Sequence, residues 1–212
     1  MIKDILVNLS YGTSQDGVSN YALSVAEKVG AHVVGIAFAY PVMAGGLGLP
    51  ANFSRAQQAE AQERAKSAAA AFDEATRRAG ISAETRVIEA GIGDVPTLFA
   101  HIARRFDLSI IGQFESGRDH PTKNIVLEAA LFESGRPVLI VPVIQKDRLK
   151  LDHVMVCWDG SRAAARAVAD AIPFLTRSGK VSIVVADIQS AKSADLPGAD
   201  IATDPSRSKR HD

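Results

Sequence analysis

Residues 151–175, with the sequence LDHVMVCWDGSRAAARAVADAIPFL, decide the fold. The segment opens with an apolar run, 154–158, that is typical of a buried strand, and Asp-Gly-Ser at 159–161 favours a turn that also caps a helix. The residues after this turn are apolar at the spacing i, i+3, i+4 and i+7, namely Val168, Ala171, Ile172 and Leu175. This spacing places them on one face of a helix, so the segment predicts a strand followed by an amphipathic helix.

The same pattern opens the chain. Residues 5–10 read ILVNLS and align with VMVCWD at residues 154–159, and a helical pattern follows each of these runs. A second apolar strand then follows in both places, at 32–40 and at 181–187. The same strand–helix–strand pattern therefore occurs at two places in the sequence.

Strand and helix patterns also alternate between these two units. The segments that predict strands are 2–9, 32–40, 83–89, 108–112 and 137–142. Four helical segments lie between these strands. The first ends near Gly30 and the second covers 53–79, whereas the third starts after Asp94 as its N-cap and the fourth covers 123–134. This alternation predicts an α/β fold with a parallel sheet and helices on both of its faces.

These patterns divide the chain into four regions. We expect residues 1–144 to form a complete domain, and residues 145–150 to be a charged linker. Residues 151–188 supply only a strand, a helix and a strand, which is part of a second domain. The tail, 189–212, is polar and mixed in charge, and this composition is typical of a disordered segment.

The composition argues against charged macromolecules as partners. The chain has 24 Lys and Arg and 24 Asp and Glu, so its formal net charge is zero, which disfavours binding to nucleic acid or to an anionic membrane. No signal-peptide pattern opens the sequence and no apolar run is long enough to span a membrane, so we expect a cytoplasmic protein. The single cysteine, Cys157, lies in an apolar strand run, and we expect it to be a buried, unreactive thiol.

Parallel sheets bind ligands at the carboxyl ends of their strands. In this chain, residues 10–14 follow the first predicted strand and residues 112–122 lie at the end of the fourth. Backbone amides near Gly112, Gly117 and the next helix start could meet phosphates, or these glycines could simply serve an ordinary turn. A P-loop is rejected because Arg118 and Asp119 stand where its lysine and hydroxyl residue belong. No nucleophile motif, catalytic carboxylate pair or metal-ligand spacing appears, so we expect neither a catalytic residue nor a metal site.

Two segments carry a resemblance to a known family. The run VMVCWDGS with the Ala-rich helix after it, and ALFESGRPVLIVP at residues 130–142, resemble the universal stress proteins in their tandem, two-domain form. The resemblance implies a Rossmann-like, doubly wound sheet of five parallel strands in the order 3-2-1-4-5. It implies that residues 1–144 are one whole domain of this family and that residues 151–188 match the first third of another.

The chain departs from the ATP-binding members of that family. Those members have an aspartate at the end of the first strand, where this chain has Ser10, and a glycine motif after the fourth strand. Gly112 matches the first glycine, but Glu115 replaces the second, and Asn124-Ile125 replaces Gly-Ser or Gly-Thr. In the second copy an aspartate is present, but no fourth strand follows it. The resemblance places a degenerate nucleotide cleft at Ser10, Gly12, Gly112, Gly117, Asn124 and Asp159.

Two functions remain open on this basis. The first is a non-catalytic stress-response or signalling protein of the ATP-independent branch, which has no cofactor and acts through contacts with an unidentified protein. The second is a protein that binds ATP and hydrolyses it slowly at most. The resemblance also implies a homodimer through the uncharged edge strand at residues 137–143, unless the partial second domain covers this edge within one chain.

Overall fold

The computed structural model describes residues 1–9, 15–40, 51–115 and 122–185 of the 212-residue chain. By contacts, the chain divides into two compact units, Met1–Leu149 and Lys150–Asp212. Within the described residues, no helix combines the length and the apolar character that a membrane span requires.

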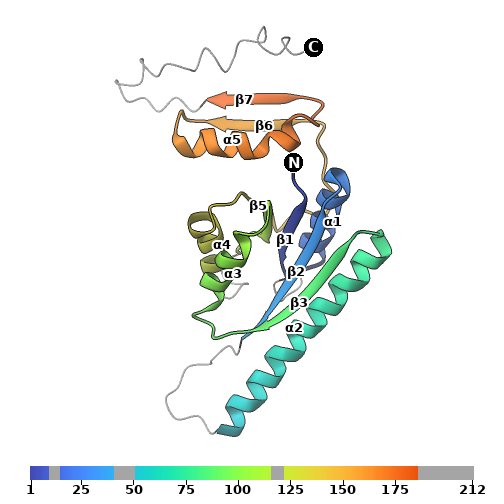
Figure 1. The fold of residues 1–212 in the computed structure, drawn as a ribbon, viewed down its shortest axis with the longest axis vertical. Coiled ribbons are helices and arrows are strands. Elements are labelled where there is room, and N and C mark those ends of the chain that lie inside the picture. Colours follow the sequence, from blue (N-terminus) through green and yellow to red (C-terminus); the bar gives the residue numbers. More distant parts are fainter. Residues whose placement is uncertain (10–14, 41–50, 116–121, 186–212) are drawn as a thin grey trace. The chain divides into compact units, whose positions relative to one another are not determined.

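The first unit is built on a five-stranded sheet (Figure 1). Its strands are β1 (Asp4–Asn8), β2 (His32–Ala39), β3 (Ala83–Glu89), β4 (Leu108–Gly112) and β5 (Val138–Val141). Every neighbouring pair is parallel and the order is β3-β2-β1-β4-β5, so the predicted doubly wound sheet is confirmed. The order leaves β3 and β5 at the two edges of the sheet.

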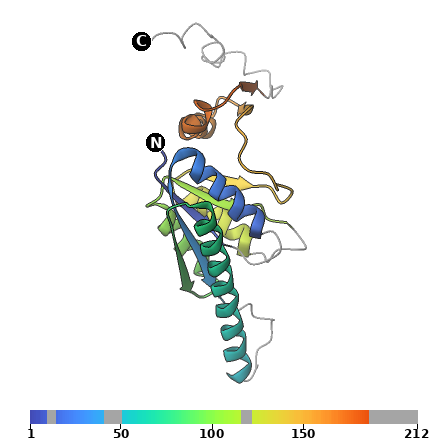
Figure 2. The same ribbon diagram turned by 90° about the vertical axis from the view of Figure 1, so that its right-hand side faces the viewer.

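Helices cover both faces of this sheet. The first pair is α1 (Gln15–Val29) and α2 (Ala51–Ala79), and Figure 2 shows both helices in front of one face. The second pair, α3 (Val95–Ala103) and α4 (Thr122–Glu133), packs together over the other face. Each crossover between parallel strands thus returns over a face of the sheet, which buries both faces of the central strands.

The core lies between the central strands and these helices. Ile5, Leu6 and Val7 of β1 are fully buried, because β1 has a neighbouring strand on each side and helices above and below. Under α3, the rings of Phe38 and Phe99 pack edge to face with their centroids 6.4 Å apart. Val95, Phe99 and Ala103 of α3 belong to this core, so one side of the helix packs against the sheet.

Asp94 is the N-cap residue of α3, as the sequence predicts, but the expected hydrogen bond from its side chain is not formed. The Asp94 carboxylate accepts no capping hydrogen bond from the helix. Backbone groups close the turn before the helix, where the Asp94 N–H donates to Gly91 O at 2.9 Å, and the Leu98 N–H donates to Asp94 O at 3.0 Å in the first helical turn. Pro96 in the first turn has no N–H to satisfy, so less is gained here from a side-chain cap.

The second unit contains β6 (Val154–Trp158), α5 (Arg162–Leu175) and β7 (Val181–Val185), with the two strands parallel. Cys157 is exposed, so the prediction of a buried thiol is wrong. Cys157 is on the exposed side of β6, opposite the side of the half-buried residues, and no described helix of the second unit covers it. Residues 186–188 of the predicted second domain and the tail at 189–212 lie outside the described residues.

Candidate functional site

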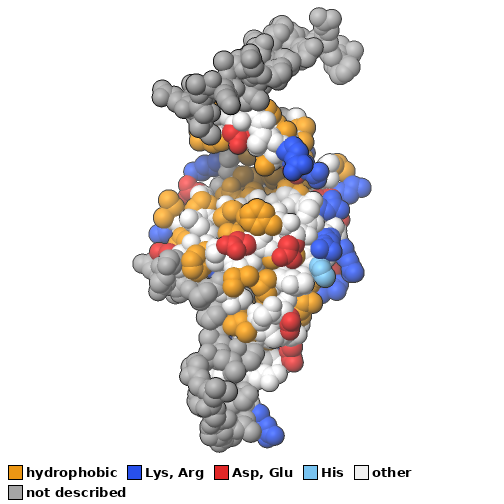
Figure 3. Space-filling model, turned by 90° about the vertical axis from the view of Figure 1, so that its left-hand side faces the viewer, with side chains coloured by type: hydrophobic (Ala, Val, Ile, Leu, Met, Phe, Trp, Pro, Cys, Tyr) orange, Lys and Arg blue, Asp and Glu red, His pale blue; other side chains and the backbone are white. Residues whose placement is uncertain are grey.

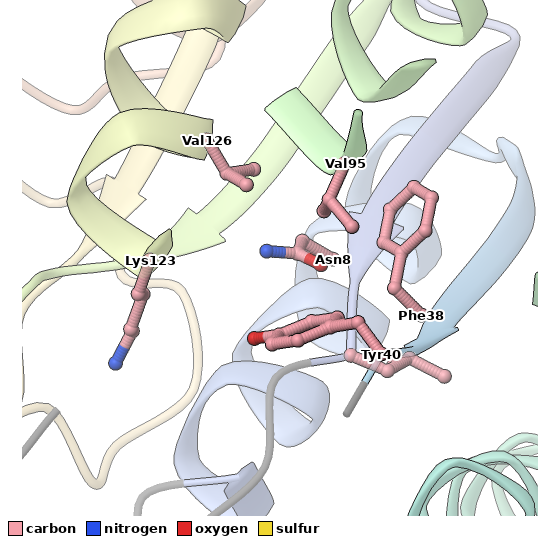
Figure 4. A pocket seen from close by; sticks show the side chains of 7 residues that line it. Asn8, Phe38, Tyr40, Val95, Lys123 and Val126 are labelled. Atoms are coloured by element: carbon pink, nitrogen blue, oxygen red, sulfur yellow. The ribbon is translucent and has the colours of Figure 1, made fainter. Parts of the chain in front are cut away.

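The candidate site lies at the carboxyl ends of β1 and β2, where they meet the starts of α3 and α4. This is the topological switch point of the sheet, because β2 and β3 follow β1 on one side of it, whereas β4 and β5 lie on the other side. Side chains from these four elements surround a small cavity (Figure 4). The residues that line it are Asn8, Leu9, Phe38, Tyr40, Val95, Lys123 and Val126.

The cavity is far smaller than a nucleotide. The lining residues enclose about 20 Å³. A single water molecule needs roughly 10–15 Å³ measured in this way, whereas small-molecule pockets are on the order of 300–1,000 Å³. As the described residues arrange it, the cleft accommodates a water molecule and little else.

Tyr40 lines the cleft. Figure 4 shows its ring extending across the opening beneath Asn8, with the hydroxyl on the side of Lys123. Burial raises the pKa of Tyr40, and the nearby charge of Arg64 partly offsets this effect. The phenol therefore stays protonated at neutral pH and presents a neutral hydroxyl to the cavity.

Asn8 provides a buried amide at the bottom of the cleft. Its side chain is 7% exposed and points into the cavity (Figure 4). Buried amides are normally hydrogen-bonded, and the cavity beside Asn8 is large enough for one bridging water. The sequence did offer a signal for this residue, since Asn8 is the one polar residue in the buried run of β1.

Gly112, a predicted cleft residue, ends β4 and is in close contact with α1. A Cβ atom on Gly112 would lie 2.8 Å from Val18 Cγ2, which is closer than real contacts allow, and 3.7 Å from Lys123 Nζ. The glycine thus allows Val18 and Lys123 to approach the end of the strand. This packing requirement explains Gly112 without any phosphate.

Lys123 is the strongest charge at the cleft, and sequence reasoning missed it. It lies in the first turn of α4 and is only 7% exposed. Its side chain passes over the end of β4, beside Gly112. A cation there adds to the positive end of the α4 dipole, so this corner of the cleft is suited to a negative charge.

Asn124 lies next along α4 but is oriented away from a phosphate role. Its Nδ2 donates to Glu128 Oε1 at 2.8 Å, so the amide faces along the outside of the helix. Glu115, on the chain after β4, is half-buried and carries a negative charge. Neither residue presents a hydrogen-bond donor where the sequence resemblance would put the phosphates.

Asp159 belongs to the second unit and acts in a turn. Its Oδ1 accepts a hydrogen bond from the Ser161 N–H at 2.9 Å. Hydrogen bonds from the side chain and then the backbone of Ser161 lower the pKa of Asp159. Ser161 in turn caps α5 by accepting from the Ala164 N–H at 3.0 Å, so Asp159 stabilises the entry into the helix.

The other three predicted cleft residues, Ser10, Gly12 and Gly117, lie outside the described residues. Of the six, the structure therefore places Gly112 and Asn124 on adjoining elements at the cleft and Asp159 in the second unit. The described parts of the chain contain no group of three or more His, Cys, Asp or Glu side chains that could hold a metal ion.

No protein-family model matches the chain, and no curated protein matches it either. Solved structures do match. A universal stress protein from Archaeoglobus fulgidus DSM 4304 has a TM-score of 0.60 and 22% sequence identity, over 91% of this chain and 68% of that chain. UspA from Lactobacillus plantarum has a TM-score of 0.51 and 12% identity, over 66% and 97% of the two chains.

A further match is a universal stress protein from Archaeoglobus fulgidus in complex with dAMP, with a TM-score of 0.46, 18% identity, and coverage of 66% and 99%. Because this TM-score is below 0.5, the ligand of that protein carries no argument about this chain. The better matches show that the chain has the fold of the universal stress proteins, so the resemblance seen in the sequence is confirmed at the level of the fold.

Proposed function

We propose that this chain is a non-catalytic universal stress protein that acts in a stress response or in signalling through protein contacts and without ATP. The observation that carries the proposal is the closed cleft. Tyr40 and Lys123 occupy the region between β1 and α4, and the cavity that remains is about 20 Å³. A nucleotide could enter this cavity only if the side chains that line it moved.

The residues around the cleft also provide few compensating contacts. Glu115 and Ile125 stand where the sequence resemblance would place partners for phosphate oxygens, and neither side chain has a hydrogen-bond donor for them. Hydrogen bonds to charged groups contribute about 1.5–3 kcal/mol each. The loss of two or three such bonds converts a micromolar dissociation constant into a millimolar or weaker one.

The surface beside α4 and β5 supports the part of the proposal that concerns protein contacts. Phe132 is 82% exposed, and Ile125 and Ile140 are 50% and 40% exposed. Figure 3 shows hydrophobic side chains spread over the face of the first unit that these elements form. The edge strand β5 carries no charge, so we propose that residues 137–143 form a homodimer contact.

Lys123 favours a second candidate function, which is the binding of an adenine nucleotide. Its ammonium group and the start of α4 together make one corner of the cleft positive. If Tyr40 turned outward, a phosphate could reach this corner. Binding of ATP with slow hydrolysis at most is therefore the alternative that an experiment must separate from the first proposal.

Mass spectrometry and the ratio of absorbance at 260 and 280 nm will show whether the purified full chain carries nucleotide. We expect none. If nucleotide is found, Lys123→Met should remove it while Lys146→Met, at an exposed lysine outside the cleft, should not. Nucleotide that is present and lost only with Lys123→Met would establish the alternative.

A further inference from the structure

We propose that the open edge of β6 pairs with the same edge of a second copy of the chain, in an antiparallel register centred on Val156. This contact is separate from the β5 contact and goes beyond the proposed function. It rests on the second unit, whose strand–helix–strand arrangement is the same as that of β1, α1 and β2.

The first unit shows what β6 lacks. β1 pairs with β2 on one side and with β4 on the other, where Leu6 lies opposite Ser109. β6 pairs with β7 through all five of its residues, and no other described strand pairs with it. The second edge of β6 is therefore open within the described part of the unit, and the strand has no charged residue to block pairing.

Exposed apolar side chains mark the same strands. Met155 of β6 is 62% exposed, whereas Leu6, at the corresponding position of β1, is fully buried. Val184 of β7 is 45% exposed, whereas Ile36 in β2 is 1% exposed. Two strands and one helix bury too little apolar surface to be stable alone, and pairing two copies makes a four-stranded sheet with a helix from each copy on one face.

The direction of the backbone groups selects the register. The Val154 N–H donates to Lys180 O at 2.9 Å, so Val154 directs its backbone groups toward β7. Along a strand these groups alternate in direction, so those of Met155 and Cys157 point to the open edge. If Met155 lies opposite Cys157 of the second copy, the two residues exchange backbone hydrogen bonds. Val156 then lies opposite Val156 of the second copy, and this pair forms no backbone hydrogen bonds with each other.

The acidic residue that follows β6 favours an antiparallel arrangement. His153 precedes the strand and Asp159 follows it. The antiparallel register centred on Val156 places Asp159 of each copy opposite His153 of the other, whose ring is hydrogen-bonded to Ser182 Oγ of β7 at 2.8 Å, so no two acidic residues face each other. A parallel arrangement would instead place Asp159 beside Asp159, and two like charges facing each other across strands are destabilising.

A disulfide tests the register in the full chain. In the Cys157→Ser background, Val156→Cys places two thiols directly opposite each other across the two-fold axis. The pair lacks cross-strand hydrogen bonds, so its Cα atoms lie about 4.5 Å apart, which is within the range that a disulfide spans. We expect mild oxidation at tens of micromolar to give a covalent dimer in non-reducing electrophoresis and intact-mass measurement.

Val154→Cys in the same background is the matched control, because Val154 is also half-buried and lies on the same side of β6. In the proposed register its two copies are four residues apart along the strands, or roughly 13 Å, and no cross-link forms. Cross-linking of Val156→Cys that is no faster than that of Val154→Cys would overturn the proposal.

Two further variants separate this contact from others. Adding Met155→Lys to the Val156→Cys chain puts a charge on the paired strand and should slow cross-linking at least tenfold, with circular dichroism confirming that the chain is folded. Adding Ile140→Lys, which disrupts the β5 edge, should leave cross-linking unchanged. Cross-linking that is lost with Ile140→Lys would show that β6 does not pair by itself, and the proposal would then be wrong.

Discussion

Gly112 and Val18 are in such close contact that a Cβ atom on Gly112 would lie 2.8 Å from Val18 Cγ2. The contact joins the end of the central strand β4 to the first turns of α1. The close contact indicates that packing accounts for the glycine at this position. The first prediction tests this interpretation.

Gly112→Ala should lower the free energy of unfolding by about 1–3 kcal/mol, because the new methyl group overpacks the contact with Val18. Urea denaturation followed by circular dichroism measures the change. Val18→Ala in the same chain should recover part of the loss. Gly93→Ala is the control, because nothing lies within 4 Å of a Cβ at Gly93. Equal stability of Gly112→Ala and the unsubstituted chain would contradict the packing role.

Ser109 in β4 is fully buried, and its hydroxyl has no hydrogen-bond partner within the described residues. Ser109→Ala removes this unpaired group, so we expect the free energy of unfolding to stay the same or to rise by up to about 1 kcal/mol. The matched control is Ser134→Ala. Ser134 is also buried, but its Oγ donates to Ala130 O and accepts from the Arg136 N–H, so its loss should destabilise the chain by about 1 kcal/mol.

We expect Ser134→Ala to lower the free energy of unfolding more than Ser109→Ala does. Denaturation in urea under one set of conditions gives both values. If Ser109→Ala destabilised the chain as much as Ser134→Ala does, the hydroxyl of Ser109 would have a partner in solution.

Asp107 makes the stability of the chain depend on pH in acid. The Lys3 N–H donates to Asp107 Oδ2 at 2.8 Å, and this hydrogen bond is the main cause of a lowered pKa, with further contributions from the Asp4 N–H and the charge of Arg136. A carboxyl group whose pKa is lower in the folded state stabilises the fold above its unfolded pKa, which is about 3.9. This contribution is lost as the pH falls through the lower, folded value.

We therefore expect Asp107→Asn to reduce the slope of stability against pH below about pH 4, because the substituted side chain does not titrate. Thermal unfolding between pH 3 and pH 6 measures the slope. An unchanged slope would mean that the carboxylate does not hold the start of β1 in solution.

Ile140 tests the homodimer contact at β5. Because β6 offers a second edge, the test uses the Met155→Lys background, in which the β6 edge is charged. We expect this chain to be a dimer at tens of micromolar by light scattering, and the addition of Ile140→Lys should make it a monomer. Ile144→Lys is the control, since Ile144 is 87% exposed and lies beyond the end of β5.

Two results would exclude β5 as the contact. A dimer that Ile140→Lys leaves intact would place the contact elsewhere. A monomer in the Met155→Lys background would mean that the β5 edge is covered within one chain or does not associate.

The arrangement of the sheet could be predicted from sequence because it depends on local patterns and a recognisable order of elements. The alternating polarity of β3 is typical of an edge strand, and β3 does lie at one edge of the sheet. The apolar run of β1 is typical of a central parallel strand, and β1 does lie between β2 and β4.

Other features depend on residues that are distant in sequence. Lys123 and Tyr40 meet at the cleft although 83 positions separate them, and no spacing rule joins them. The exposure of Cys157 could not be read from its apolar neighbours, because burial needs a covering layer that the second unit does not supply in its described part. Local patterns therefore identified the strands but not what covers them.

Calorimetric titration of the full chain with magnesium and ATP separates the two proposed functions. The closed cleft at Tyr40 and Lys123, with Glu115 on the chain after β4, predicts no binding tighter than about 1 mM. Tyr40→Ala, which opens the cleft without adding a phosphate ligand, should not bring the dissociation constant into the micromolar range. A micromolar dissociation constant for the unsubstituted chain would contradict the account.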